Sequence, residues 1–287
     1  MSLPTDLSLY LHERLGLPVQ QVRALGGGCI HHATRVETEV DTFFLKYNRP
    51  DQAHNFEAEA AGLTLLAAHT PLGVPRVLAT GTTGNHAFLL LQFVEQGPPA
   101  RDYWEQLGRG LAVLHQHSAP AFGLDSDNYI GSLPQVNGWR SAWVDFFMEC
   151  RVQPMQRLAR ARGLLSNDDE RHLDRLRDRL AEWMPAEEPA LIHGDLWGGN
   201  LLCDAQGAPV LIDPAVSYSH REMELAFMTL FDRQPPAFYQ AYAEVWPLQP
   251  GYRERFDCYN LYPLLVHLNL FGSSYYAAVR DILHRYA

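Results

Sequence analysis

The segment HGDLWGGN, at residues 193–200, is followed by PVLIDPA at residues 209–215, and together they indicate the fold. They place Asp195, Asn200 and Asp213 at fixed spacing among short apolar runs. Asp and Asn are common turn residues because their side chains bond the nearby backbone, and a turn role would account for any one of them alone. The complete spacing, between strand-like segments, favours a functional loop instead.

The spacing also predicts a particular chemistry. His193, Asp195 and Asn200 match the kinase pattern H-x-D-x-x-x-x-N, and Asp213 lies thirteen residues beyond Asn200. Phosphoryl transfer needs Mg²⁺ against the charge of ATP, and this hard ion takes carboxylate and amide oxygens. We therefore expect Asn200 and Asp213 to bind the metal, and Asp195 to orient the attacking hydroxyl and accept its proton. His193 is expected to brace the loop.

A glycine triplet in the first part of the chain is the candidate phosphate loop. Gly26, Gly27 and Gly28 lie between two strand-like segments, and glycine lets backbone amides approach a phosphate closely. A plain hairpin turn is an equally good interpretation of the triplet alone. Cys29 follows directly, where nearby positive charge would favour a reactive thiolate. We expect a redox-sensitive position there, although an inert small residue is equally compatible.

A lysine and a glutamate are expected to pair in the same part of the chain. Lys46 ends the apolar run Phe43–Leu45, and on the following helix Glu59 falls on the apolar face whereas Glu57 falls well off it. A carboxylate on a buried face is costly unless it is paired. We therefore predict a Lys46–Glu59 pair, which in kinases positions the α- and β-phosphates of ATP.

Secondary-structure signals divide the chain into two parts. Apolar alternation and turn residues predict strands in the first part, and helical periodicity predominates in the second. The strands are expected at 18–25, 33–38, 41–47, 77–80 and 87–93, with a strand-like patch at 190–213, and the helices at 5–15, 51–68, 101–117, 139–162, 167–183 and beyond 213. The class is α+β, with an N-lobe at residues 1–96 and a helical C-lobe at 97–287. Gln92 and Val94, before this boundary, are expected to bond adenine through their backbone.

Composition excludes several classes of protein. The net charge of −10 makes a nucleic-acid binder a poor interpretation, because such proteins carry a basic face. No apolar run is long enough for a transmembrane helix, and the first residues lack the features of a secretory signal. The four cysteines are far apart and form no CxxC, which favours a reducing, cytoplasmic setting.

Several longer motifs bring a family into view. They are GGGCIHHA (26–33), FEAEAAGLTLL (56–66), FGLDSDNYIGSLPQVN (122–137), the stretch from Trp139 to Arg151, HGDLWGGN and IDPAVSYSHREMELAF (212–227). The sequence resembles the fructosamine-3-kinase, or ketosamine-3-kinase, family, which is related to the aminoglycoside phosphotransferases. The resemblance implies a protein-kinase-like bilobal fold and the use of ATP with Mg²⁺. It implies phosphorylation of the 3-hydroxyl of small ketosamines and of ketosamines on glycated proteins. The sequence itself leaves open whether the protein is a monomer or a dimer.

The same resemblance suggests substrate contacts. Trp197, inside HGDLWGGN, is a candidate for the sugar pocket. Asp127 is a candidate for holding the amine or a sugar hydroxyl, with a turn-stabilising role as its equal alternative. Residues 220–222 (His-Arg-Glu) either touch the substrate or form a structural ion pair. The chain has Asp213-Pro214-Ala215 where protein kinases have Asp-Phe-Gly, so a switch of their kind is not expected.

Two other functions compete with this one. A kinase of another small alcohol, such as an aminoglycoside or choline, would use the same catalytic residues, and the segment DNYIGSLPQ favours the ketosamine. A catalytically silent nucleotide-binding protein is the third alternative. Retention of Lys46, Glu59, Asp195, Asn200 and Asp213 argues against it.

Overall fold

The computed structural model describes residues 2–26 and 31–286. They form two compact units, one made of residues 1–103 with 202–213 and the other of residues 104–201 with 214–287. The segment 202–213, which the sequence placed in the later lobe, thus folds with the early part of the chain. The lobe boundary between residues 96 and 97 stays a prediction.

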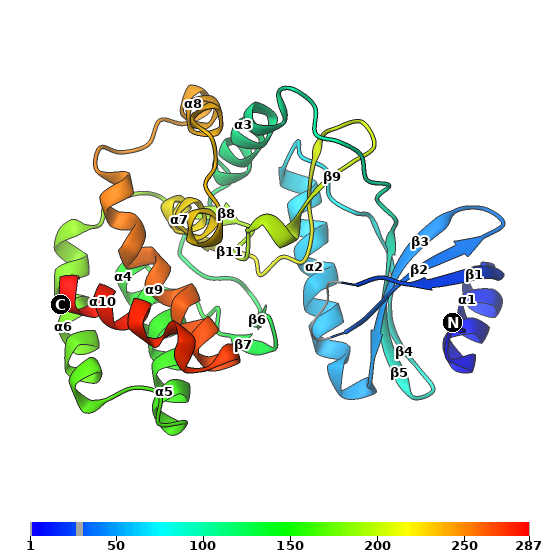
Figure 1. The fold of residues 1–287 in the computed structure, drawn as a ribbon, viewed down its shortest axis with the longest axis horizontal. Coiled ribbons are helices and arrows are strands. Elements are labelled where there is room, and N and C mark those ends of the chain that lie inside the picture. The colour runs from blue at the N-terminus through cyan, green and yellow to red at the C-terminus, as the bar shows by residue number, and fades with distance from the viewer. Residues whose placement is uncertain (1, 27–30, 287) are drawn as a thin grey trace. The chain divides into compact units, whose positions relative to one another are not determined.

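A five-stranded antiparallel sheet forms the first unit, in the order β1-β2-β3-β5-β4. The strands are β1 (Val19–Ala24), β2 (His32–Thr38), β3 (Thr42–Asn48), β4 (Val77–Thr83) and β5 (His86–Gln92). Helices α1 (Thr5–Leu15) and α2 (Ala53–His69) cover opposite faces of this sheet (Figure 1), and the 3₁₀ turn η1 (Pro50–Gln52) precedes α2. Every strand expected in the first hundred residues is present, and a turn at Gly84-Asn85 joins β4 to β5.

Strand β5 shows how the two faces of the sheet are filled. Phe88 and Leu90 pack in the core under α1, whereas Leu89 and Leu91 pack in the core under α2. Successive side chains of a strand point to opposite faces, so a continuous apolar run is required when both faces are buried. The run AFLLL at 87–91 meets this requirement and places β5 at the centre of both cores.

The late segment joins the first unit through backbone bonds. The two-stranded ribbon of β9 (Leu201–Cys203) and β10 (Pro209–Leu211) ends shortly before Asp213. Gly73 donates to the carbonyl of Pro209 at 3.1 Å and accepts from Leu211 at 2.8 Å, and Gly97 donates to the carbonyl of Cys203 at 3.2 Å. These bonds fix the strand that leads to Asp213 against the unit that carries Lys46.

The second unit is mainly helical. Its helices are α3 (Tyr103–His115), α4 (Trp143–Phe146), α5 (Gln153–Ala161), α6 (Asn167–Trp183), α7 (Arg221–Phe231), α8 (Pro236–Val245), α9 (Tyr252–Phe271) and α10 (Tyr276–Tyr286), with the short turns η3 (Gly198–Asn200) and η4 (Ser273–Tyr275). Two small ribbons complete it, β6 (Asn128–Ile130) with β7 (Leu133–Gln135), and β8 (Ala190–Ile192) with β11 (Ser217–Ser219).

The helix expected over 139–162 is not continuous. It begins at Trp143 and passes through a π-helical segment, η2 (Phe147–Val152), before α5. The π-helical segment is almost entirely buried, because Phe147, Met148, Cys150, Arg151 and Val152 all lie in the core.

A capping box begins α6. Ser166 is the N-cap, and Asp169 completes the box. The Ser166 hydroxyl accepts from the backbone of Asp169, whose carboxylate accepts in return from the backbone of Ser166. The buried Asp169 carboxylate also accepts from the Tyr276 hydroxyl at 2.9 Å.

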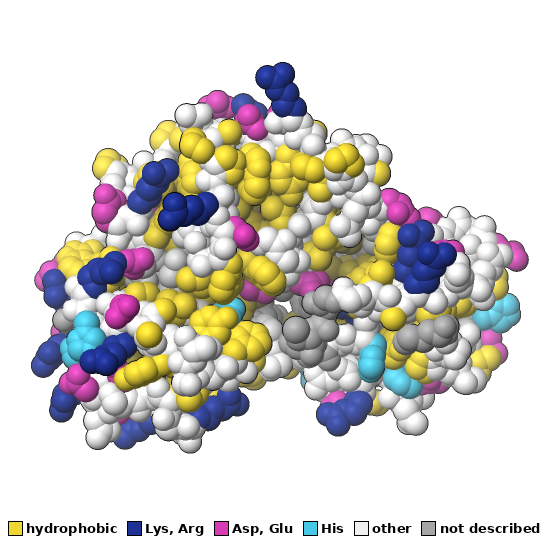
Figure 2. All heavy atoms as spheres, viewed as in Figure 1, with side chains coloured by type: hydrophobic (Ala, Val, Ile, Leu, Met, Phe, Trp, Pro, Cys, Tyr) yellow, Lys and Arg dark blue, Asp and Glu magenta, His cyan; other side chains and the backbone are white. Residues whose placement is uncertain are grey.

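The surface has no dominant basic stripe on the face that can be seen. In Figure 2, Lys and Arg side chains are scattered among acidic and apolar ones. Within residues 2–26 and 31–286, no helix combines the length and apolar character needed to cross a membrane.

Candidate active site

A lysine with two carboxylate partners lies in the first unit. Lys46 Nζ is 2.8 Å from Glu59 Oε1 and 2.6 Å from Asp213 Oδ1, and the lysine is buried. Glu57, by contrast, is exposed and faces His54. The predicted choice of Glu59 over Glu57 is confirmed, because the helix turns only Glu59 towards the sheet. The role of the pair in ATP binding stays a prediction.

Burial and charge act against each other in this cluster. Burial by itself lowers the pKa of the Lys46 ammonium, but the two carboxylates more than offset it and hold that pKa above its ordinary value. Burial raises the pKa of Glu59, helped by the nearby Asp213 and opposed by Lys46. The Lys46 ammonium therefore pairs with two carboxylates at once. It could keep one of them and bind a phosphate oxygen in place of the other.

Asp213 has an unusual backbone. Its φ is 55°. Among the residues that the structure describes, it is the only one other than a glycine with a left-handed backbone conformation. Asp tolerates this region better than most residues, and such conformations persist where the surrounding structure imposes them. Here the β10 strand on one side and Pro214 on the other fix the turn. The carboxylate is thereby directed to Lys46 rather than along the strand.

The loop after β8 brings two predicted residues together in the second unit. Asn200 Nδ2 donates to the backbone carbonyl of Asp195 and to its carboxylate Oδ2, both at 2.8 Å. Asn200 is buried in the short η3 turn, whereas Asp195 is partly exposed. Because the amide nitrogen is used within the loop, the amide oxygen is the atom that a cation would bind. The Asp195 carboxylate is oriented by the same bonds.

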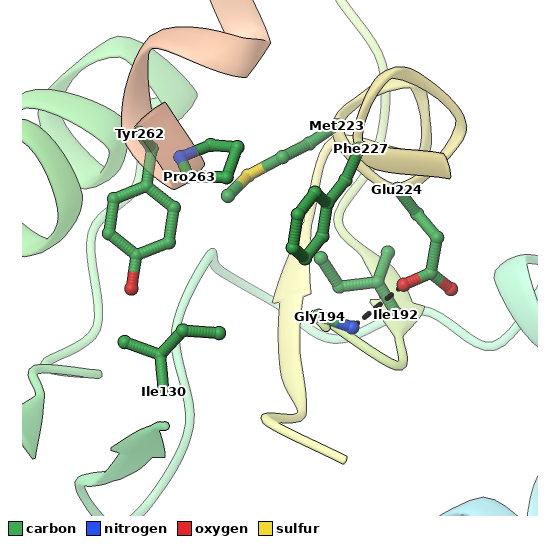
Figure 3. Close-up of a pocket in the computed structure, with 8 residues that line it drawn as sticks. All are labelled: Ile130, Ile192, Gly194, Met223, Glu224, Phe227, Tyr262 and Pro263. Carbon is green, nitrogen blue, oxygen red and sulfur yellow. Dashed lines mark hydrogen bonds between the residues drawn. The ribbon is translucent and has the colours of Figure 1, made fainter. Parts of the chain in front are cut away.

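The backbone before Asp195 is held by a buried glutamate. Glu224, on α7, accepts from the amide of His193 at 3.0 Å. It also accepts from the amide of Gly194 at 2.7 Å, the bond drawn in Figure 3. Gly194 has φ 84°, and a Cβ there would lie 2.1 Å from the carbonyl oxygen of Ala215. Only glycine fits this close approach. His193 is fully buried and accepts from the Asp195 amide at 3.3 Å, so its expected bracing role is confirmed.

The buried His115 stabilises the charge of the Glu224 carboxylate. His115 Nε2 lies 3.2 Å from Glu224, and His115 Nδ1 lies 2.7 Å from the Tyr242 hydroxyl. With the proton on Nε2, His115 donates to the carboxylate and accepts from Tyr242. Burial by itself raises the pKa of Glu224, but the bonds from His115 and the loop outweigh it and hold the pKa below its ordinary value.

A small cavity lies beside this anchor. It has a volume of about 10 Å³ and is lined mainly by apolar side chains, together with Gly194 and Glu224 (Figure 3). Room for about one water molecule excludes it as a substrate site.

The segment DNYIGSLPQVN, at residues 127–137, forms a network of buried hydrogen bonds. Asn128 donates to the carbonyl of Val216 at 2.9 Å, and Gln135 donates to the carbonyl of Ala215 at 3.0 Å. Gln135 also donates to Asn128 at 2.8 Å and accepts from Tyr262 at 2.7 Å. These bonds hold the backbone just after Asp213-Pro214. The sequence analysis used this segment as a family signature and missed its structural role, because its hydrogen-bond partners are 80 and 88 residues away.

Arg151 anchors the other end of the network. Its guanidinium donates to Asn137 Oδ1 at 2.7 Å and to the carbonyl of Val136, and it lies 4.5 Å from the ring of Phe146. Burial holds the pKa of Arg151 below its ordinary value. Asp127 accepts from the backbone of Asn137 at 2.8 Å, which is the turn-stabilising alternative for that residue. A substrate role for Asp127 stays a prediction.

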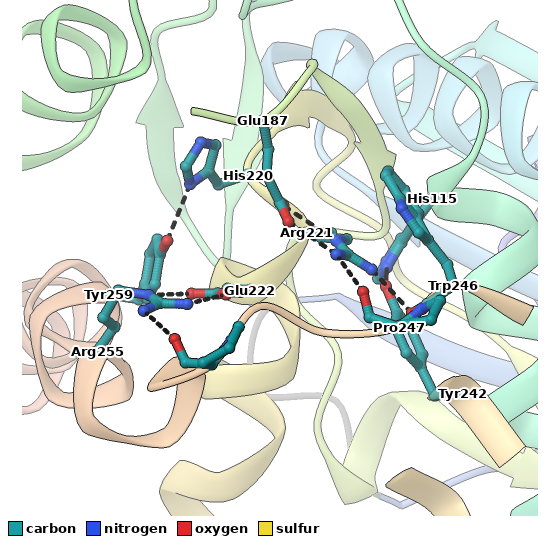
Figure 4. Close-up of polar contacts among 11 residues, drawn as sticks. His115, Glu187, His220, Arg221, Glu222, Tyr242, Trp246, Pro247, Arg255 and Tyr259 are labelled. Carbon is teal, nitrogen blue, oxygen red and sulfur yellow. Dashed lines mark hydrogen bonds and ion pairs between the residues drawn. The ribbon is translucent and has the colours of Figure 1, made fainter. Parts of the chain in front are cut away.

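The His-Arg-Glu segment at 220–222 is buried in the second unit (Figure 4). Arg221 binds Glu187 with a shortest distance of 2.7 Å, and Glu222 binds Arg255 at 2.5 Å. Of the two roles left open by the sequence, these contacts support the structural ion pair. Burial, with the two arginines nearby, lowers the pKa of His220 to about 3.

The remaining predicted residues are placed as follows. Trp197 is exposed in the loop that carries Asp195. Gln92 ends β5, and its amide already donates to the carbonyl of Arg76 at 2.9 Å. Val94 follows in the linker and is half-buried, whereas Gly26 is exposed and has open space where a Cβ would lie. Gly27, Gly28 and Cys29 lie outside the described residues.

Known proteins resemble the chain over nearly its whole length. The fructosamine kinase family matches residues 5–287. A protein named "Probable ketoamine kinase" from Lactiplantibacillus plantarum is 41% identical over 270 residues, which cover 93% of this chain and 95% of that protein. Protein-ribulosamine 3-kinase of Arabidopsis thaliana, a chloroplastic protein, is 36% identical over 283 residues. The match covers 96% of this chain and 85% of that protein.

Solved structures agree with the sequence relatives. A protein provisionally named fructosamine-3-kinase from Haemophilus somnus superposes with a TM-score of 0.88 at 30% identity, covering 98% of this chain and 96% of that one. An aminoglycoside phosphotransferase superposes with a TM-score of 0.63 at 16% identity and 98% coverage of both chains, which shows a shared fold. The α+β, protein-kinase-like fold expected from the sequence is confirmed. The chain belongs to the fructosamine kinase family.

Proposed function

We propose that this protein transfers the γ-phosphoryl group of ATP to the 3-hydroxyl of a ketosamine. The observation that carries the kinase assignment is the buried Lys46 bound to both Glu59 and Asp213. A cation paired in this way is suited to bind phosphate oxygens. The ketosamine rests on the family and on relatives named for ketoamines and ribulosamine.

Each residue has a chemical role in this proposal. Asp195 accepts the proton of the 3-hydroxyl while the hydroxyl oxygen bonds to the γ-phosphorus and the bond to ADP breaks. Asn200 keeps the carboxylate in one orientation through its bond to Oδ2. Lys46 binds the α- and β-phosphates, and Glu59 holds the lysine in place.

Mg²⁺ fits the donor set of the two remaining residues. Asp213 offers a carboxylate and Asn200 an amide oxygen, and both are hard oxygen ligands of the kind that this ion selects. When bound, Mg²⁺ would neutralise part of the charge on the phosphates. The phosphorylated ketosamine then favours loss of its sugar, so the activity would restore the free amine.

Release of ADP over a substrate panel tests this function. With Mg-ATP, we expect turnover of ribulosyl-lysine and fructosyl-lysine, and of accessible glycated lysines in a protein. An analogue without the 3-hydroxyl should be inert because no nucleophile remains. Turnover of an aminoglycoside or choline with no turnover of either ketosamine would show that the substrate is wrong and that only the kinase chemistry holds.

Two substitutions separate the roles of the carboxylates. Asp195→Asn should reduce kcat by at least ~10²-fold while nucleotide affinity stays near wild type, because only the base is lost. Asp213→Ala should instead abolish Mg²⁺-dependent ATP binding, measured by calorimetry. Unchanged turnover in the first variant, or unchanged Mg-ATP affinity in the second, would remove that residue from its role.

A further inference from the structure

A row of aromatic side chains, three of them exposed and two half-buried, begins at the loop that carries Asp195 and continues over the second unit. We call it the aromatic strip, and its members are Trp197, Phe231, His267, Phe271 and Tyr275. Ring centroids are 6.1 Å apart for Trp197–Phe231, 4.9 Å for Phe231–His267, 5.4 Å for His267–Phe271 and 5.0 Å for His267–Tyr275. The strip is thus continuous from a residue two positions beyond Asp195 to the end of α9.

Three members of the strip are large hydrophobic residues that are nevertheless exposed, whereas His267 and Tyr275 are half-buried. Trp197 is 41% exposed, Phe231 43% and Phe271 59%. Within residues 2–26 and 31–286, these three are among only seven large hydrophobic residues that are exposed. Scattered exposed residues need no explanation, but contiguous ones indicate a surface that binds something.

The charge beside the strip indicates which ligand it suits. Asp232 follows Phe231, and its carboxylate accepts from the amide of Gly198 at 3.2 Å, next to Trp197. Burial lowers the pKa of His267, partly offset by its bond to the carbonyl of Pro263 at 2.7 Å, so this ring is uncharged near neutral pH. The only basic residue that follows directly in sequence is Arg233, whose side chain is exposed to solvent. An aromatic surface with an adjacent carboxylate suits an ammonium group that carries an apolar arm.

We propose that the aromatic strip binds the amine-bearing arm of the ketosamine, with Asp232 facing the protonated amine and apolar groups of a glycated peptide against Phe231 and Phe271. This inference rests on the proposed function and adds a specificity to it. The sugar is fixed by the loop at Asp195, and the arm leaves along the surface that starts at Trp197. Glycated peptides with apolar neighbours should therefore be preferred over those with polar neighbours.

The test compares two ribulosyl-lysine peptides that differ only in their flanking residues, Leu in one and Ser in the other. For wild type, kcat/KM of the Leu peptide divided by kcat/KM of the Ser peptide should be about five. This factor corresponds to burial of about 40 Å² of apolar surface at about 25 cal/mol per Å². Phe271→Ser should reduce this ratio towards one. Asp232→Asn should raise KM for both peptides, and added salt should shrink the difference from wild type.

Controls distinguish the strip from a general loss of surface hydrophobicity. Leu9→Ser, on α1 and outside the strip, replaces an apolar side chain that is 49% exposed and should leave the ratio unchanged. Peptide affinity measured by calorimetry without nucleotide tests the strip independently of turnover. One outcome separates the two proposals. If neither ketosamine peptide is phosphorylated, the proposed function fails. If in that case the Leu peptide still binds more tightly than the Ser peptide and Phe271→Ser removes the difference, the strip is still a peptide-binding surface.

Two results would overturn the inference. In one, wild type phosphorylates both peptides with equal kcat/KM. In the other, Phe271→Ser converts a dimer to a monomer in sedimentation experiments while the peptide ratio is unchanged, which would make the strip a contact between two copies of the chain.

Discussion

Replacing Glu224 by Gln tests whether a buried carboxylate anchors the catalytic loop. The carboxylate accepts from two loop amides, on His193 and Gly194, and from His115. Gln is nearly the same size but offers one acceptor oxygen and one NH₂ group. In either orientation of the amide, its NH₂ faces at least one N–H donor that then has no acceptor.

The magnitude follows from these contacts. A hydrogen bond to a buried charged group contributes about 1.5–3 kcal/mol, and a buried donor left without an acceptor costs about 1–3 kcal/mol. We expect the free energy of unfolding to fall by about 3 kcal/mol. Because the same amides fix the turn before Asp195, kcat should fall by at least ~10-fold, the scale of a small misplacement of the base.

Denaturant unfolding and ADP release measure the two effects. Glu244→Gln is the matched control, because Glu244 lies in the same unit, is exposed and pairs with Arg109 at 2.8 Å. An exposed pair contributes little, so its loss should change stability by less than about 1 kcal/mol. If Glu224→Gln costs no more than this control and keeps wild-type kcat, the anchoring role is refuted.

Three more substitutions have distinct outcomes. Gly194→Ala should cost about 2–4 kcal/mol and most of the activity, because its Cβ would meet a carbonyl at 2.1 Å; Gly163→Ala, with φ 69° and open space around it, should cost only about 1 kcal/mol in denaturant unfolding. Arg151→Lys should lower the free energy of unfolding by about 2–3 kcal/mol, because one ammonium cannot keep the bonds of a buried guanidinium, and an unchanged denaturation midpoint would contradict the network. His220 stays unprotonated in the folded state down to about pH 3, whereas in the unfolded state it binds a proton below pH 6.5, so stability should fall by about 1.4 kcal/mol per pH unit below 6.5. His220→Gln should have a shallower slope between pH 6.5 and 5, and equal slopes would show that other groups cause the loss.

Local patterns in the sequence predicted what depends on local geometry. The helical phase selected Glu59 rather than Glu57 as the partner of Lys46, and the structure has that pair. Alternation and turn residues predicted the strands of the first unit. The spacing of Asp195 and Asn200 predicted a common loop, where they share two hydrogen bonds.

Contacts between distant residues were not predictable in the same way. Nothing in the neighbourhood of His115 shows that it meets Tyr242 and Glu224, more than 100 positions later. The network from Arg151 to Ala215 likewise joins segments that only the tertiary fold brings together. A better signal was present in Arg151 itself, since an arginine between the apolar residues Cys150 and Val152, in the aromatic-rich segment 143–152, needs acceptors if it is buried.

The late ribbon that completes the first unit has a consequence for synthesis of the protein. The first 103 residues lack β9 and β10, so Gly73 and Gly97 cannot form their bonds to this ribbon until residues 202–213 have left the ribosome. Asp213, the last residue of that segment, also supplies one of the two carboxylates that neutralise the buried Lys46. A nascent chain stalled before this point would hold a sheet with a partly compensated internal cation. Complete folding of the early half therefore waits for nearly three quarters of the chain, although its five main strands are made first.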